Sequence, residues 1–487
     1  MSPFESLPRD LLRIIVDSVL DDIPTPEDPV VGYNLPLDKT PWLLVRTTLR
    51  NLCLTSKTFC EYARKALYRH ATVTDGHSMA LFLDTLIKNP LLGPSARTFA
   101  CLVGADATCT TDFPLRTTVA GFLDFSHYLP LKALADVVDS RYVIEEKRKP
   151  YRLFMDTLIA LLWLMPNVDR TCLPLPVEGG FGQSRATAVF RSLGYGDRPA
   201  PPLQNLTYVQ IWPHGLPPED YLDLALYGPV FGALPKLERL ELTGDDGDFE
   251  AFSDARSESQ YAGPIRHLVL QQSSCTPCDV TDICNRLGQL CTLSVTTNAE
   301  NATYSLYPEL DLCYMNCGSG GPRSPSNCLN DGLPLIKDTL TSLHLQLDYN
   351  TNVGPLFGPA GKLTSLPTLS RLRMLSIGVL QLYTLSEIMT NDPHRSKLVD
   401  LLPASISEFR LHIDAKQQRV NNKTWCCVLL QILEKFAENV RVRLPHLATV
   451  ILVFYDPSYR AYDSEFATLA ADFAQQGVLL SYRESDL

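Results

Sequence analysis

The sequence lacks any long hydrophobic run. Its longest apolar stretches, Leu158 to Met165 and Leu447 to Tyr455, are far shorter than the roughly 20 residues that a helix needs to cross a bilayer. The chain begins with MSPFESLPRD, which has neither the basic start nor the apolar core of a secretory signal peptide. We therefore expect no membrane as a partner, and a location in the cytoplasm, the nucleus or both.

Basic charge is also scarce. The 487 residues include 43 Lys and Arg against 54 Asp and Glu, a formal net charge of −11, and no stretch is rich in Lys or Arg. Affinity for nucleic acid depends on basic side chains that contact the phosphates, so we expect no nucleic acid as a partner. With 45% apolar and 20% charged residues, the composition is typical of an ordered, folded chain.

The 14 cysteines form no dense framework but are scattered along the chain. In a chain without a signal peptide, this distribution predicts reduced thiols. One alternative is a zinc site made by Cys275, Cys278, Cys313 and Cys317, whose two pairs have roughly the spacing of zinc ligands. The gap between the pairs is wider than usual and other cysteines lie nearby, so we predict no metal site and no cofactor.

Recognisable catalytic motifs are missing as well. The sequence contains neither Gly-x-Ser-x-Gly nor His-Glu-x-x-His, and its nine histidines are dispersed. The glycine-rich segment 178–184 precedes a possible helix and could cradle a phosphate, but it lacks the Gly-Lys-Ser/Thr ending of a P-loop. We predict no catalytic residue. A hydrolase or transferase within residues 71–200 is kept as a third class of function.

Two helical segments stand at the start of the sequence. The first segment is residues 6–20, which have apolar residues at spacings of three and four. The second segment is residues 42–69. The apolar stripe of the first segment consists of Leu7, Leu11, Ile14, Ile15 and Val19. The two segments are too small to enclose a core of their own. The stripe must therefore be buried against the rest of the chain or against a partner.

These segments resemble the F-box motif. The resemblance is carried by Leu7-Pro8 and the stripe after it, and by the Leu-x-Leu-x-Ser-Lys-x-Phe pattern of residues 52–59. F-box helices dock on the Skp-type adaptor of a cullin-RING ubiquitin ligase, so the resemblance implies this adaptor and, through it, a cullin as partners. The sequence departs from the family pattern at residues 21–41, where an acidic, Pro-rich loop takes the place of a short connection. The adaptor-binding residues that the resemblance implies are Leu7, Pro8, Leu11, Ile14, Ile15, Leu54 and Phe59.

Behind these helices the sequence repeats an apolar triplet, with two variable residues after its first member and one after its second. The copies are Leu203/Leu206/Tyr208, Leu237/Leu240/Leu242, Ile265/Leu268/Leu270, Leu290/Leu293/Val295, Tyr307/Leu310/Leu312, Leu340/Leu343/Leu345, Leu372/Leu375/Ile377, Ile406/Phe409/Leu411 and Leu447/Val450/Leu452. Helical candidates, among them 280–290 and 425–440, lie between copies. A strand alternating with a helix over about 30 residues predicts a solenoid with a parallel sheet. The alternative is a single α/β globule with a parallel sheet.

The repeats resemble irregular leucine-rich repeats, and an F-box followed by leucine-rich repeats is a familiar architecture. We therefore predict an α/β chain in three parts. Residues 1–70 form the F-box-like helical module, residues 71–200 form a helical cap with degenerate first repeats, and residues 201–487 form the leucine-rich-repeat-like solenoid. Within the second part, Met165-Pro166-Asn167-Val168 is similar to the lead-in of a repeat.

In a strand of this pattern, the apolar positions point into the core and the alternate residues project onto the concave face. That face mixes charged, imidazole and apolar side chains, which suits a protein or peptide ligand, although a merely solvated sheet would also look like this. The strand at 447–455 is apolar on both faces, so the helix at 461–475 or a target should cover Thr449, Ile451 and Val453. The predicted target-binding residues are Arg239, Glu241, His267, His344, Met374, Arg410 and His412.

These patterns and the resemblance predict a non-catalytic substrate receptor of a cullin-RING ubiquitin ligase. Its N-terminal module would hold the Skp-type adaptor, and its solenoid would hold a target protein of unknown identity. The alternative is a leucine-rich-repeat interaction scaffold in which the helical module folds back as a cap and recruits no ligase.

Overall fold

The computed structural model describes residues 7–20, 40–103, 157–158, 160–176, 203–214, 231, 234–244, 264–273, 275, 277–297, 325–347, 363–383, 398–413, 422–455 and 457–484. They belong to two compact units, which divide between Thr243 and Gly244. Among these residues, no helix is both long enough and apolar enough to cross a bilayer. Each unit contains a run of parallel strands.

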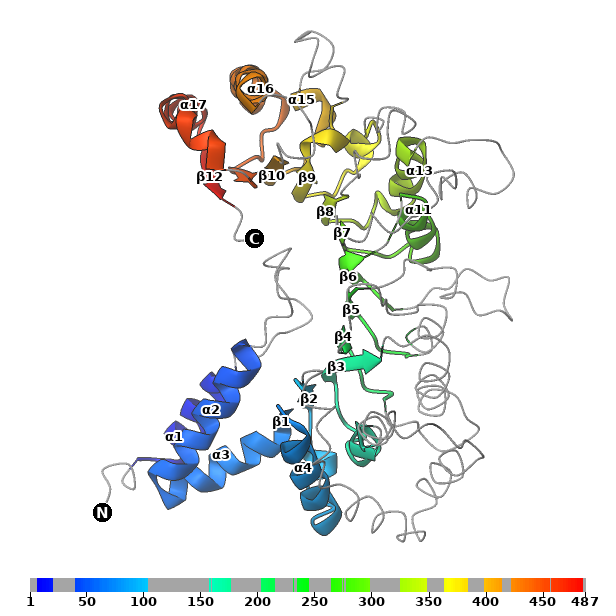
Figure 1. Ribbon diagram of the computed structural model, residues 1–487, viewed down its shortest axis with the longest axis vertical. Coiled ribbons are helices and arrows are strands. Elements are labelled where there is room, and N and C mark those ends of the chain that lie inside the picture. Colours follow the sequence, from blue (N-terminus) through cyan, green and yellow to red (C-terminus); the bar gives the residue numbers. More distant parts are fainter. Residues whose placement is uncertain are drawn as a thin grey trace. The chain divides into compact units, whose positions relative to one another are not determined.

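Three helices open the first unit and are named here the N-terminal helical module (blue in Figure 1): α1 (Arg9–Leu20), α2 (Thr40–Thr55) and α3 (Lys57–Arg69). Pro8 precedes α1, where no backbone N–H is required, and its carbonyl accepts amide groups of the first turn. Ser56 separates α2 from α3 and caps α3, because its hydroxyl accepts the N–H of Phe59 at 3.1 Å. The helices predicted over 6–20 and 42–69 are confirmed.

The first unit continues with strands that pair in parallel and in chain order. Helix α4 (Gly76–Lys88) begins in a capping box, in which the Asp75 carboxylate accepts the N–H of Ser78 at 2.7 Å and the Ser78 hydroxyl accepts the N–H of Asp75 at 3.2 Å. The other elements are β1 (His70–Val73), η2 (Gly93–Ser95), β2 (Thr98–Cys101), β3 (Arg170–Pro176), β4 (Tyr208–His214) and β5 (Arg239–Thr243).

The N-terminal helical module shares its core with the first strands. One buried cluster contains Leu12, Val16, Val45, Leu49, Phe59, Ala63 and Ala66 of the helices together with Ala100, Leu102 and Cys172 of the β2 and β3 segments. The module therefore packs on its own chain. Burial of this apolar surface holds the three helices in place, because helices this short are marginal on their own.

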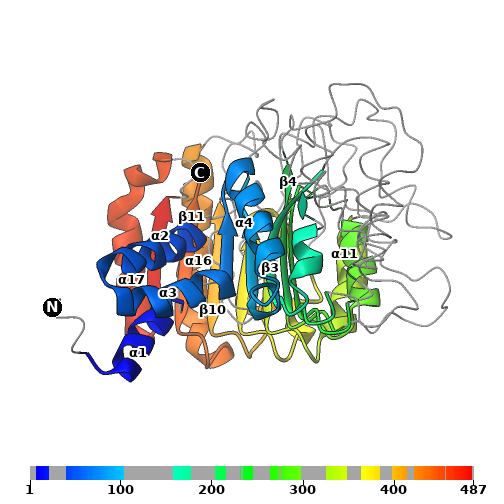
Figure 2. The ribbon, with the colours of Figure 1, turned by 90° about the horizontal axis from the view of Figure 1, so that it is seen from below.

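The second unit also has parallel strands that pair in chain order, and their common direction can be followed in Figure 2. Its strands are β6 (His267–Ser273), β7 (Thr292–Thr297), β8 (Ser342–Gln346), β9 (Met374–Gly378), β10 (Glu408–Ile413), β11 (Thr449–Phe454) and β12 (Leu479–Glu484). Its helices, which line one side of the strands in Figure 1, are α11 (Pro277–Arg286), α13 (Pro325–Gly332), α15 (Leu398–Leu401), α16 (Asn422–Arg443) and α17 (Asp463–Gln475). Short 3-10 turns are η6 (Leu333–Ile336), η8 (Leu366–Thr368), η9 (Val379–Gln381) and η11 (Pro457–Tyr462).

The predicted apolar triplets mark the strands. Seven of the nine have all three members buried with the strand at the expected place, from Leu237/Leu240/Leu242 in β5 to Leu447/Val450/Leu452 in β11. A ladder of backbone hydrogen bonds joins the residues just before successive strands: Thr341 N donates to the Cys291 carbonyl, Arg373 N to that of Thr341, and Ser407 N to that of Arg373, each at 2.8 Å. Each repeat is thereby fixed to the one before it.

Two triplets differ from the prediction. The strand register pairs Val209 with Leu240 and Ile211 with Leu242, so these two residues are the core positions of β4, and Tyr208 lies on the opposite face. The placement of Tyr208 in the core of the repeat was wrong by one residue. The triplet at 307–312 lies outside the described residues, and β7 pairs directly with β8.

This topology is that of an α/β solenoid with leucine-rich-repeat-like units. In each unit every strand pairs with the strands before and after it in the chain. A doubly wound α/β globule instead reverses its strand order at a switch point. The predicted fold class is therefore confirmed.

Candidate interaction surfaces

The N-terminal helical module exposes large apolar side chains on α1 and α2, which together we name the helical apolar face. Ile14 is 60% exposed, Leu54 79% and Leu11 46%. Exposed apolar side chains that form a contiguous patch are a general feature of interaction sites. The face consists of Leu11, Ile14, Ile15, Leu43, Leu44 and Leu54.

Helix α1 is apolar on two sides. Leu12 and Val16, one turn apart, are buried in the shared core, whereas Leu11 and Ile14 of the predicted stripe are exposed. Leu7 and Val19 pack half-buried against the core. The sequence left open whether the stripe meets its own chain or a partner. The structure uses one side of α1 for its own chain and leaves the other side open.

Most of the residues that the F-box resemblance implies for the adaptor lie on or beside the helical apolar face. Pro8 is exposed at the start of α1, next to the exposed residues of that helix. Phe59 differs, because it is only 3% exposed and belongs to the core beneath Ser56. Phe59 must therefore be corrected from a contact residue to a core residue. Residues 21–39 of the predicted loop lie outside the described residues.

On the strands of the first unit, Arg239 and Glu241 occupy the face opposite the apolar core, as predicted. They form a buried ion pair, with Arg239 Nη2 2.6 Å from Glu241 Oε1, and the guanidinium lies 5.8 Å from the centre of the Tyr208 ring. Burial, followed by the Glu241 carboxylate, raises the pKa of Tyr208 well above its usual value. Arg239, at 5% exposure, is satisfied inside this cluster, so the prediction that it reaches a target directly must be corrected.

A hydrogen-bonded chain of four side chains crosses the corresponding face of the second unit. Ser376 Oγ lies 2.7 Å from His412 Nε2, and His412 Nδ1 lies 2.9 Å from the Tyr455 hydroxyl. The Tyr455 hydroxyl in turn donates to Gln346 Oε1 at 3.0 Å. Because that amide oxygen can only accept, Tyr455 accepts from His412 Nδ1–H, and Nε2 accepts the Ser376 hydroxyl proton. The neutral imidazole is therefore fixed in one tautomer.

The Ser376–His412 pair has the contact of a nucleophile and its base but not the other properties of such a pair. Ser376 is only 4% exposed and His412 only 5%, so a substrate cannot reach them. Burial, then the charges of Arg410 and Arg483, lowers the pKa of His412 to about 3, so it is a weak base at neutral pH. We interpret the chain of hydrogen bonds as a rigid support for the face.

His344 belongs to the same cluster. It is 2% exposed, its ring centre lies 5.3 Å from that of His412, and burial lowers its pKa well below the usual value. The prediction that His344 and His412 contact a target directly is therefore corrected, because both are internal. Four predicted target-binding residues remain half-buried and reachable: Glu241, His267, Met374 and Arg410.

The two faces of the apolar strand at 447–455 are covered differently. Helix α17 packs on the core side, where Phe466 lies 5.3 Å from Phe454 between ring centres. On the other face Thr449 and Ile451 stay half-buried, and only Val453 is fully covered, at 4% exposure. Of the two covers expected, α17 lies on the core side instead, so cover of this face by a target stays a prediction.

The thiols show no sign of a metal centre in the described part of the chain. No three His, Cys, Asp or Glu side chains of the described residues form a group that could hold a metal ion. Burial raises the pKa of Cys284 to about 12, so this cysteine stays a protonated thiol. Cys313 and Cys317 of the considered zinc set, and the glycine-rich segment 178–184, lie outside the described residues.

The comparison with known proteins leaves these surfaces as the main guide to function. The sequence matches no known family model, and no curated protein matches it.

Proposed function

We propose that this chain is the substrate-recognition subunit of a cullin-RING ubiquitin ligase. The N-terminal helical module binds a Skp-type adaptor and, through it, a cullin, and the solenoid binds a target protein. The observation that carries the proposal is the helical apolar face. Leu11, Ile14 and Leu54 are exposed at the positions where the F-box resemblance expects adaptor contacts.

The division of labour on α1 supports the same function. Leu12 and Val16 belong to the core that the module shares with the strand residues Ala100 and Cys172, which gives the adaptor a rigid handle on the rest of the receptor. Leu11 and Ile14 stay available on the other side of the helix. A receptor of this kind works by raising the effective concentration of the target near the ligase, so it needs no catalytic residue of its own. It acts in the cytoplasm, the nucleus or both.

The experiment is co-purification of the full chain with a Skp-type adaptor. We expect a stoichiometric complex for the wild type and none for the double variant Leu11→Asp/Ile14→Asp, because two buried carboxylates oppose an apolar interface. Leu81→Asp is the matched control, since Leu81 is 53% exposed on α4, outside the helical apolar face. It should form the complex. All three proteins should melt at similar temperatures, because none of these side chains is buried.

Failure of the folded wild-type chain to bind any Skp-type adaptor would refute the ligase assignment. So would unchanged binding by the double variant. The remaining function would then be an interaction scaffold in which the helical module is a cap, and the core that the module shares with Ala100, Leu102 and Cys172 is compatible with this role.

A further inference from the structure

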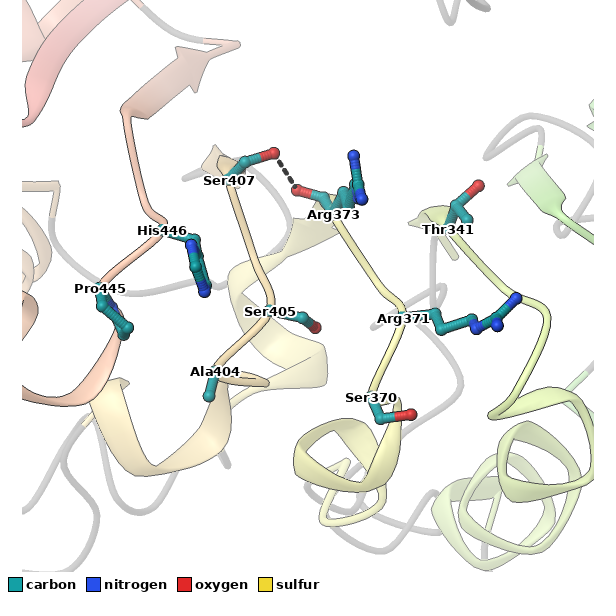
Figure 3. Close-up of a pocket in the computed structure, with 9 residues that line it drawn as sticks. All are labelled: Thr341, Ser370, Arg371, Arg373, Ala404, Ser405, Ser407, Pro445 and His446. Atoms are coloured by element: carbon teal, nitrogen blue, oxygen red, sulfur yellow. Dashed lines mark hydrogen bonds between the residues drawn. The ribbon is translucent and has the colours of Figure 1, made fainter.

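The segments that lead into β8, β9, β10 and β11 enclose a groove of about 1080 Å³, which we name the lead-in groove. It lies at the edge of the second unit where these strands begin, apart from the face that carries His344 and His412. Figure 3 shows Arg371 extending toward the segment that carries Thr341, and His446 beside the segment that carries Ser405. The groove is lined by Thr341, Ser370, Arg371, Arg373, Ala404, Ser405, Ser407, Pro445 and His446.

The lining has an unusual balance of charge for this protein. The chain as a whole has a formal charge of −11, yet the described residues of the lining include two arginines, a histidine and no carboxylate. Two acidic residues on adjoining elements are engaged elsewhere, Glu408 with Arg410 at 2.5 Å and Asp400 with Arg443 at 2.9 Å. A cationic groove in an acidic protein favours an anionic ligand by electrostatic complementarity.

Three hydroxyl groups of the groove have already used their protons. Thr341 Oγ1 donates to the Cys291 carbonyl at 2.9 Å, Ser405 Oγ to that of Leu372 at 2.8 Å, and Ser407 Oγ to that of Arg373 at 3.0 Å. Their lone pairs remain able to accept from the N–H groups of a ligand. The groove thus offers cationic donors for anionic groups and neutral acceptors for backbone amides.

The walls of the groove are fixed before any ligand arrives. The carbonyl of Arg373 accepts the N–H of Ser407 at 2.8 Å as well as its hydroxyl, and the N–H of Arg373 donates to Thr341. The exposed side chains of Arg371 and Arg373 have to be ordered on binding. Binding to a preorganised backbone loses less conformational entropy than binding to a mobile loop.

The dimensions suit a short extended peptide. Four neighbouring strands span three strand spacings, which is about 14 Å, and an extended chain rises about 3.3 Å per residue. The groove therefore has room for about four residues. Single-stranded nucleic acid fits less well, because it binds to aromatic stacking platforms and no Phe, Tyr or Trp is among the lining residues that the structure describes.

We infer that the lead-in groove binds an extended anionic peptide segment of the target. Arg371 and Arg373 pair with its carboxylate or phosphate groups, and the guanidinium fork suits both kinds of group. Glutamate side chains and phosphorylated serines share this chemistry. The inference rests on the proposed function, since it names the chemistry of the target segment.

The test is fluorescence anisotropy of the full chain with labelled extended peptides: one rich in glutamate, one carrying phosphoserine and a neutral one rich in glutamine. We expect at least one anionic peptide to bind at least tenfold more tightly than the neutral peptide, and its affinity to fall as salt rises. A tighter phosphopeptide identifies phosphate as the recognised group, whereas a glutamate peptide that binds as well identifies negative charge alone. Both results support the inference.

The decisive variant is Arg371→Ala/Arg373→Ala, which should weaken binding of the anionic peptide at least tenfold. Arg266→Ala is its matched control. Arg266 is an exposed arginine directly before β6, just as Arg373 directly precedes β9. The control variant should change the affinity less than twofold. Far-ultraviolet circular dichroism should show all variants folded.

Three results would overturn the inference: equal binding of the neutral peptide, unchanged affinity in the double variant, or no binding of either anionic peptide at millimolar concentration. A labelled oligothymidine that binds as tightly as the peptides, and loses its affinity in the double variant, would assign the groove to nucleic acid instead. Co-purification with the adaptor should be unaffected by Arg371→Ala/Arg373→Ala. Failure of the groove and failure of the adaptor assignment are therefore separate results.

Discussion

At the scale of single residues, the solenoid face of the second unit is built from side chains that satisfy one another. The hydrogen bonds from Ser376 through His412 and Tyr455 to Gln346 join residues that are far apart in the chain. A buried polar side chain without a hydrogen-bond partner costs free energy, so these hydrogen bonds together favour a single arrangement of the four side chains. The reachable residues Met374 and Arg410 lie two positions before Ser376 and His412, on the same strands.

The buried neutral state of His412 predicts a pH-dependent stability. Its pKa is about 3 in the folded protein against an ordinary value of 6.5, so below pH 6.5 the unfolded chain binds a proton that the folded chain does not. The free energy of unfolding should therefore be highest above pH 6.5 and fall by about 1.4 kcal/mol per pH unit for this group as the pH drops toward 3.

Urea unfolding between pH 6.5 and pH 5 measures this effect. The His412→Gln variant should show a shallower pH dependence than the wild type by about one proton. His446→Gln, which replaces an exposed histidine of the same unit, should keep the wild-type slope. Equal slopes for wild type and His412→Gln would contradict the assignment of a neutral buried imidazole.

The two sides of α1 predict opposite responses to alanine. Leu12 is fully buried, so Leu12→Ala should lower the free energy of unfolding by about 2–5 kcal/mol through lost burial and the cavity that it leaves. Ile14 is 60% exposed, so Ile14→Ala should cost less than about 1 kcal/mol. Chemical denaturation of both variants checks the pair, and a larger loss for Ile14→Ala would show that the exposed side of α1 is part of the core.

At the scale of elements, the end of the second unit depends on the turn between α17 and β12. The side chain of Arg441 in α16 donates to the carbonyls of Gln476, Gly477 and Pro445, and so ties α16 to that turn. Gly477 has a φ of +70°, the left-handed conformation that favours glycine after a helix. Arg441 and Gly477 therefore support the turn that leads into β12, which pairs with β11.

We expect Gly477→Ala to destabilise this end of the protein by about 1–2 kcal/mol. A Cβ atom there would strain the backbone and would lie 2.6 Å from Arg441 Nη2. Gly288→Ala is the matched control, because a Cβ atom at Gly288 meets nothing within 4 Å and its φ is not positive. The midpoint of thermal unfolding and the rate of proteolytic cleavage after residue 470 measure the difference in stability between the two variants. Equal behaviour of the two variants would contradict this role of the turn.

At the scale of the whole molecule, the sequence predicts the repeat architecture because the strands from β5 to β11 bury the same apolar triplet. It misses β12, since LLSYRE does not show that triplet, and β3, whose Thr171 pairs with Val209 at the middle position of the triplet. At β4 both Leu206-x-Tyr208 and Val209-x-Ile211 fit the pattern, and only the pairing with β5 selects the second. The candidate surfaces were less predictable, because the cover over His412 comes from Tyr455 on another strand, and both sides of α1 are apolar.

The proposed adaptor surface and the lead-in groove belong to different units and share no residue, which predicts that they act independently. Two ligands influence each other's binding only when both shift the same equilibrium between two states of the protein. A receptor that acts as a tether needs no such coupling. Adaptor affinity measured by calorimetry should therefore change less than twofold when the anionic peptide saturates the groove. A larger change would show that the solenoid transmits target binding to the helical module, and the receptor would then act as a switch as well as a tether.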